Sequence, residues 1–128
     1  MKAFLTSILM FIIALILGVI LIPISIVLSI PIVFIVDSAE EAYNKLATYL
    51  KAIAMGIDQL GNVTLEYALN GIMITKNGYQ FGNKMETISS VLGKNQVQNT
   101  LTKYGWVLVN ILNKINPNHC FNAINNKV

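Results

Sequence analysis

Arginine is absent from the 128 residues, and histidine and cysteine occur once each. The planar guanidinium of arginine is the side chain best suited to bidentate recognition of phosphate and guanine. Residues 37–128 carry eight Lys against six Asp and Glu, a net charge of +2 that is too small for an electrostatic footprint on DNA or RNA. The sequence therefore predicts no nucleic-acid partner.

The scarcity of His and Cys also limits the chemistry of any site. A zinc site is expected to need three or four nitrogen or sulfur ligands, and the chain offers only His119 and Cys120. One Cys excludes a disulfide within the chain. No P-loop, dinucleotide-binding glycine pattern or HExxH is present. We therefore expect neither a metal nor another cofactor.

Charge is missing from Ala3 to Val36, a run of 34 residues. Crossing a hydrocarbon core of about 30 Å takes roughly 20 apolar residues, whereas 34 residues in one helix measure about 51 Å. Pro23 and Pro31 interrupt the run. Two topologies stay open: one kinked span that continues beyond the bilayer, and a helical hairpin that turns near Pro23. A cleaved signal peptide is disfavoured because its apolar region has only about 7–15 residues.

The remaining residues have the composition of a small polar domain. The sequence thus divides into a transmembrane segment, 1–36, and a mostly helical domain, 37–128. Ser38 and Glu41 form a capping box, S-x-x-E, and apolar residues recur at helical spacing from Leu46 to Leu60. Lysines flank the apolar segment too evenly to orient it across a membrane.

Further helices and one β-hairpin are expected in residues 62–115. Asn-Gly dipeptides at 70–71 and 77–78 favour hairpin turns, while residues 104–112 are apolar nearly all round, which indicates deep burial or contact with an interface. The expected fold class is membrane-anchored and mainly α, with a helix to about residue 69, a short hairpin in 72–82, a helix from 86 to about 93, and a last helix over 96–115.

Five residues are candidates for chemistry. Glu86, Ser89, Ser90 and His119 have the residue types of a Ser–His–Glu constellation, and Cys120 offers a thiol next to His119. No nucleophile-elbow glycine pattern surrounds either serine. A structural interpretation is simpler: residue 86 or 87 caps a helix, His119 hydrogen-bonds a helix end, and Cys120 is a small buried apolar group.

Three spaced elements resemble a known group of proteins. They are D-Q-L-x-N at residues 58–62, E-T-[LI]-S-S at residues 86–90, and a closing His119-Cys120. Behind a long apolar N-terminal segment, this combination resembles uncharacterised small membrane proteins of tailed phages and prophages. The likeness covers most of residues 57–120 as spaced motifs, with Val91 where Arg often follows the serines. It implies a phage or prophage source and no mechanism.

We therefore expect a membrane protein of phage or prophage type that acts by interaction at the cell envelope, in the bacterial inner membrane. Its expected partners are the lipid bilayer and either a second copy or a host envelope protein. One alternative is a holin-like, membrane-permeabilising protein, since small residues on the apolar segment favour close helix contacts. Another is a membrane-tethered hydrolase that uses Ser89 or Ser90 with His119 and Glu86.

Overall fold

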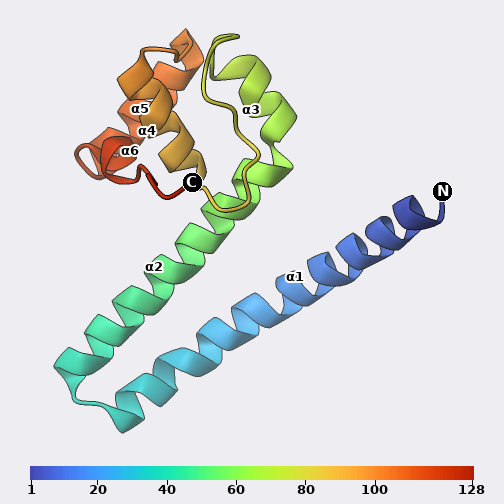
Figure 1. Ribbon diagram of the computed structural model, residues 1–128. Coiled ribbons are helices and arrows are strands. Elements are labelled where there is room, and N and C mark those ends of the chain that lie inside the picture. The colour runs from blue at the N-terminus through green and yellow to red at the C-terminus, as the bar shows by residue number, and fades with distance from the viewer. The chain divides into compact units, whose positions relative to one another are not determined.

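The computed structural model describes residues 1–128 and contains no strand, which confirms the mainly helical prediction (Figure 1). Contacts group the residues into two compact units, Met1–Leu50 and Lys51–Val128. The second helix contributes to both units, so the boundary between these contact units lies inside it. The six helices are α1 (Lys2–Val36), α2 (Ala39–Thr64), α3 (Glu66–Ile72), α4 (Ile88–Gln98), α5 (Lys103–Ile115) and α6 (His119–Asn122).

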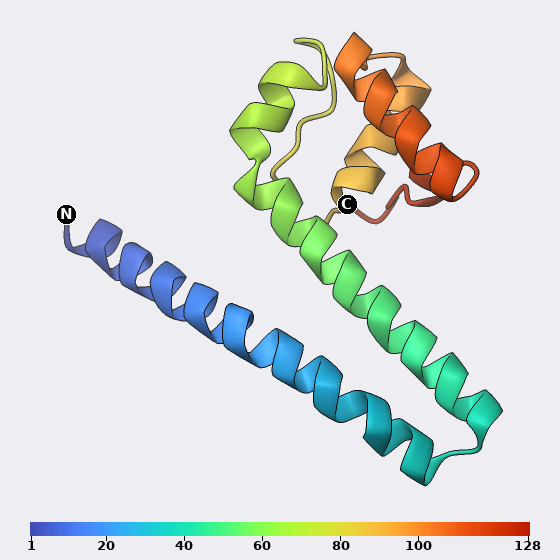
Figure 2. The ribbon, with the colours of Figure 1, turned by 180° about the vertical axis from the view of Figure 1, so that it is seen from behind.

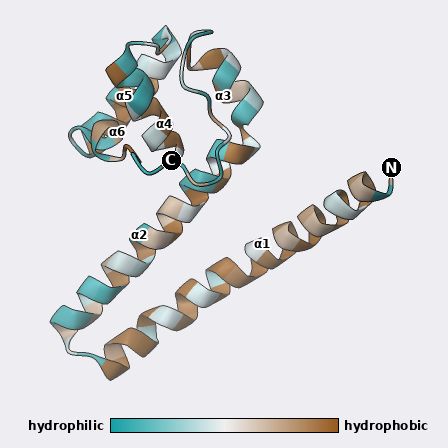
Figure 3. Cartoon of the chain, in the orientation of Figure 1, coloured by the Kyte–Doolittle hydropathy of each residue, from teal (hydrophilic) through white to brown (hydrophobic).

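The apolar segment forms one continuous helix, α1, that passes through both Pro23 and Pro31. The alternative of a hairpin at Pro23 is therefore wrong. None of its side chains is buried, and its surface is apolar along nearly the whole length (Figure 3). By length and composition α1 can cross a membrane, a property shared by membrane anchors and signal sequences.

The turn between α1 and α2 contains one half of the predicted capping box, because the Glu41 carboxylate bonds the hydroxyl of Ser38 and not its backbone N–H. The N–H of Glu41 donates to the hydroxyl of Ser38 over 3.5 Å, and that hydroxyl donates to the Glu41 carboxylate over 3.1 Å. Lys45, which follows Glu41 by four residues, forms an ion pair with Asp37. Because Asp37 ends α1, this ion pair ties the end of α1 to the first turns of α2.

Two aromatic contacts hold the first part of α2 beside the last part of α1. The rings of Phe34 and Tyr43 meet edge to face, with centroids 5.3 Å apart. The hydroxyl of Tyr49 donates to the Ser25 hydroxyl over 3.4 Å. Residues 25–34 of α1 therefore lie next to the charged start of α2.

In the unit Lys51–Val128, α4, α5 and α6 pack on one another around a small apolar core (Figure 2). A Cβ added at Gly93 would collide with the carbonyl oxygen of Cys120, so α6 approaches α4 as closely as it does because residue 93 is glycine. The buried core residues are Leu69, Ile74, Phe81, Val91, Leu92, Leu101, Val109 and Cys120.

The predicted helix over 96–115 is two helices. Asn99 adopts the left-handed conformation, with φ 55°, and ends α4. The hydroxyl of Thr102 then accepts the N–H of Gly105 and caps α5. The helix expected to end near Gly93 instead continues to Gln98, because Gly93 serves helix packing and not termination.

The predicted β-hairpin is also wrong, since the only β pairing is an isolated bridge between Ile74 and Leu101. Three asparagine side chains take the place of a ladder by bonding the backbone of residues 79–86. Asn95 bonds the N–H and C=O of residue 79, Asn70 bonds those of residue 81, and Asn62 bonds the N–H of residue 82 and the carbonyls of residues 83 and 86. The loop thus satisfies its backbone without strands.

Candidate functional site

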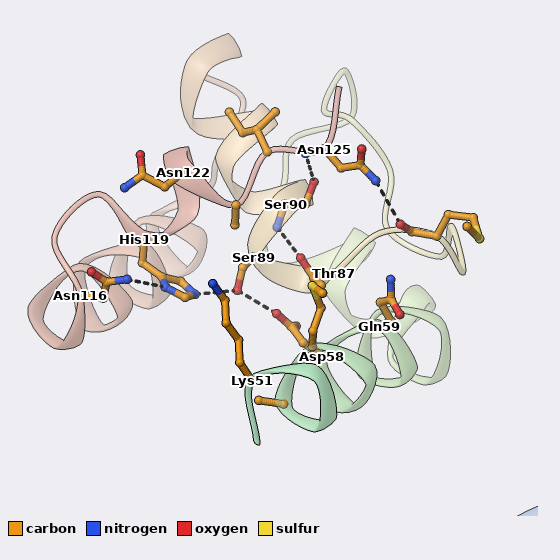
Figure 4. Close-up of a pocket in the computed structure, with 15 residues that line it drawn as sticks. Lys51, Asp58, Gln59, Thr87, Ser89, Ser90, Asn116, His119, Asn122 and Asn125 are labelled. Atoms are coloured by element: carbon orange, nitrogen blue, oxygen red, sulfur yellow. Dashed lines mark hydrogen bonds between the residues drawn. The ribbon is translucent and has the colours of Figure 1, made fainter. Parts of the chain in front are cut away.

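A cleft of about 670 Å³, lined by polar and apolar side chains, opens in the unit Lys51–Val128 (Figure 4). Its walls come from α2, from the loop before α4, from the first turn of α4, and from the chain around α6. Four of its ten polar residues carry carboxamide side chains. The ten polar residues are Lys51, Asp58, Gln59, Thr87, Ser89, Ser90, Asn116, His119, Asn122 and Asn125.

A chain of hydrogen bonds crosses the cleft wall (Figure 4). Asp58, on α2, accepts the hydroxyl of Ser89 at 2.9 Å on one oxygen and the N–H of Ile88 at 2.9 Å on the other. The Nε2 atom of His119 lies 3.2 Å from the Ser89 hydroxyl, and its Nδ1 lies 3.5 Å from the side-chain nitrogen of Asn116. Asp58 therefore caps the first turn of α4. Through the Ser89 hydroxyl, α2 and α4 are also linked to His119 of α6.

The direction of this chain follows from the single proton of the Ser89 hydroxyl. An ionised carboxylate is a stronger acceptor than a neutral imidazole, so that proton lies toward Asp58. His119 then carries its proton on Nε2 and donates it to Ser89, while Nδ1 accepts from Asn116. In this arrangement His119 is a donor, whereas a hydrolase needs it to accept the serine proton.

A second network surrounds Glu86, which is buried. Its carboxylate accepts the hydroxyls of Ser90 at 2.8 Å and Tyr79 at 2.7 Å, and it pairs with the Lys94 ammonium at 2.7 Å. Burial by itself raises the pKa of Glu86, but the bonds from Lys94, Tyr79 and Ser90, together with the Lys94 charge, outweigh it and hold the pKa below its usual 4.5. Ser90 also accepts the N–H of Asn125, so its hydroxyl both donates and accepts within the chain.

The structure thus separates the sequence candidates. Ser89 and His119 meet within hydrogen-bonding distance, but Glu86 bonds Ser90 and not His119. Cys120 lies in the core, where burial and the negative charge of Asp58 raise its pKa to about 11. The thiol is therefore protonated at neutral pH and unsuited to nucleophilic attack.

Sequence reasoning missed Asp58 as the acid beside Ser89. A signal was present, because Asp58 and Asn62 are spaced i, i+4 and so lie on one face of α2. That face meets the start of α4, where Asp58 bonds residues 88 and 89, and Asn62 bonds the carbonyl of Glu86. Thr87 accepts the N–H of Ser90, as predicted for a helix cap.

The structure brings together no group of three or more His, Cys, Asp or Glu side chains able to hold a metal ion. The cleft offers hydrogen-bonding groups, the ammonium of Lys51 and apolar side chains to a ligand. No family model, curated protein or solved structure matches the chain.

Proposed function

We propose that α1 anchors the chain in a membrane, taken to be the bacterial inner membrane, and that the unit Lys51–Val128 acts there by binding another polypeptide. The protein is in this proposal an envelope protein of phage or prophage type. The observation that carries the proposal is α1 itself, 35 residues with no buried side chain. A helix that leaves so much apolar surface uncovered needs an apolar solvent.

The contacts of α1 favour one depth in the bilayer. Residues 25–34 of α1 lie beside Tyr43 and Tyr49 of α2, and Glu40 and Glu41 lie at the start of that helix. Charged side chains are costly inside hydrocarbon. The bilayer core therefore holds the part of α1 that precedes Pro23, about 20 residues, which is the length a crossing requires.

The cleft has free groups for a ligand. The side chains of Lys51, Gln59 and Asn122 line it and form no hydrogen bond or ion pair within the chain. Carboxamides both donate and accept, which matches a peptide backbone, and the Lys51 ammonium complements a carboxylate. The volume of 670 Å³ lies within the range of about 300–1,000 Å³ typical of ligand pockets. We infer that the partner offers a polar segment with an acidic group.

Photocrosslinking in cells tests this proposal. A benzophenone amino acid placed at Gln59 is expected to give one discrete product that contains a second polypeptide. The same amino acid at Gln80, which is exposed and outside the cleft, should not give it. Adding Lys51→Ala with Asn122→Ala should remove the product at position 59. Identical products at both positions, or none at position 59, would contradict binding in the cleft.

A hydrolase is the second candidate, because Ser89 and His119 lie 3.2 Å apart at the cleft. Catalysis would require the Ser89 hydroxyl to turn its proton from Asp58 to His119. That change is unfavourable because the Asp58 carboxylate is the stronger acceptor. The binding proposal predicts that purified chain and its Ser89→Ala variant hydrolyse an activated ester at the same rate. A rate that falls at least 100-fold on this substitution would favour the hydrolase.

The holin-like alternative has less support. It depends on small residues of α1 that are free to pack against other copies, and the hydroxyl of Ser25 already accepts from Tyr49 of its own chain. We therefore expect expression of the chain alone to leave the membrane potential intact.

A further inference from the structure

Helix α5 carries an apolar row that the fold does not cover. Tyr104, Val107, Ile111 and Ile115 are spaced by three and four residues, so they lie along one side of the helix. Their side chains are 63%, 51%, 50% and 79% exposed. Figure 2 shows α5 from its outer side, where no other segment crosses it.

The row is distinct from the side of α5 that builds the core. Gly105 and Val109 are the buried residues of α5, and they lie about a third of a turn from the exposed row at 100° per residue. Both the core side and the outer side are therefore apolar. A contiguous exposed apolar surface of this kind marks a site of contact with a membrane or a partner.

The charges next to the row identify which of these it fits. Lys103 and Lys114 are exposed and stand along one edge of the row, and α5 contains no acidic residue. The unit Lys51–Val128 holds seven Lys and three acids, a net charge of +4. Two of those acids, Asp58 and Glu86, are engaged inside the unit. A partner that fits this surface must itself be both apolar and anionic. The surface of a bilayer that contains anionic lipids has both properties.

We propose that this row of α5 lies on the surface of the bilayer in which α1 is anchored, with Lys103 and Lys114 against anionic headgroups. The inference rests on the proposed anchoring by α1. Because α1 and α5 belong to one chain, a bilayer that holds α1 stays within reach of α5, so even a weak second contact is populated. Tyr104 adds an aromatic ring of the type enriched at membrane interfaces.

Spin labelling of the full chain tests the proposal. Ile111→Cys is labelled and the chain is reconstituted in vesicles of equimolar phosphatidylcholine and phosphatidylglycerol. Cys120 is buried and its thiol is protonated at neutral pH, so it reacts slowly, and unsubstituted chain treated in parallel measures any label on it. The matched control is Val97→Cys on α4, an apolar side chain that is 62% exposed and not part of the row.

Bilayer contact predicts that the label at 111 is relaxed more by oxygen, which concentrates in lipid, than by a water-soluble nickel chelate, and that the label at 97 shows the reverse. Lys103→Gln with Lys114→Gln should weaken the contact at 111 about fivefold for each lysine. A label at 111 that the nickel chelate relaxes as strongly as it does at 97 would overturn the proposal. So would spin–spin broadening that dilution with unlabelled chain removes, since it would show a second copy on the row.

Failure of the anchor gives a different result from failure of this inference. If α1 does not insert, alkaline extraction releases the labelled chain from the vesicles. If α1 inserts but the row does not touch lipid, the chain resists extraction while the label at 111 stays in water.

Discussion

Replacing Lys94 by methionine is expected to destabilise the unit Lys51–Val128 by about 3–5 kcal/mol, because it leaves a buried charge without its partner. The Glu86 side chain is fully buried and lies 2.7 Å from the Lys94 ammonium, which also stands 4.3 Å from the centre of the Tyr79 ring. Urea unfolding of the full chain in detergent, followed by the fluorescence of Trp106, measures the loss. Trp106 is the only Trp and packs against the core, so it reports on this unit.

Two further variants separate the ion pair from general effects of losing a lysine. Lys103→Met removes an exposed lysine that has no ion pair, and it should change stability by less than about 0.5 kcal/mol. Lys94→Met combined with Glu86→Gln should recover part of the loss, because a neutral amide is less costly to bury than a carboxylate. If Lys94→Met and Lys103→Met unfold at the same urea concentration, the ion pair does not stabilise the fold.

The same pair predicts how stability depends on pH. The pKa of Glu86 is lowered in the folded state, so its contribution is complete above the usual 4.5 and is lost as the pH falls through the lower folded value. The pKa of Lys94 is raised: burial lowers it, but the bonds to Glu86 and Tyr79 and their charges outweigh burial. The contribution of Lys94 to stability is complete below its usual pKa of 10.5. It is lost as the pH rises from 10.5 through the higher pKa of the folded state. Lys94→Met should reduce the alkaline loss without abolishing it, because the raised pKa of the buried Cys120 thiol also costs stability as the pH rises above its usual 9.0.

Asn62→Asp is the second substitution with a large expected effect. The amide nitrogen of Asn62 donates to the carbonyls of Asn83 and Glu86, both at 2.9 Å, and its oxygen accepts the N–H of Gly82 at 3.1 Å. A carboxylate keeps the acceptor but turns negative oxygen toward two carbonyls. Since Asn62 is fully buried, we expect the free energy of unfolding to fall by about 1–3 kcal/mol or more.

The pH dependence of this variant distinguishes lost hydrogen bonds from a general packing defect. A protonated aspartic acid can donate one hydrogen bond again, so the deficit relative to the unsubstituted chain should shrink at acidic pH. Asn77→Asp is the control, because Asn77 is exposed and its side chain forms no hydrogen bond, and it should unfold like the unsubstituted chain. A deficit in Asn62→Asp that stays constant with pH would contradict the proposed donors.

Local patterns in the sequence predicted those parts of the fold that local physics decides. The uncharged run predicts α1, and Ser38 with Glu41 predicts the start of α2, because a cap needs only neighbouring residues. The break at Asn99 was missed because its left-handed conformation depends on the packing around it. The hairpin was wrongly predicted for the same reason, since asparagines from α2, α3 and α4 bond the backbone of that loop.

The candidate site was predictable in its residue types and not in its pairings. Ser89 and His119 were named together from the sequence, and they do meet. The acid next to Ser89 is Asp58 and not Glu86, although Glu86 is closer in sequence. Residues three apart at the start of a helix can face different neighbours, and only the packing of α2 on α4 decides which acid reaches the serine.

Alkaline extraction followed by mass determination tests most directly the claim that α1 is a membrane anchor. We predict that the chain stays in the membrane pellet at its full mass of 14.1 kDa. We also predict that Ile13→Lys with Leu17→Lys releases it, because each lysine at the centre of a crossing costs about 3 kcal/mol. A chain that has lost α1 by cleavage, or an intact chain that alkali extracts without those lysines, would contradict the account.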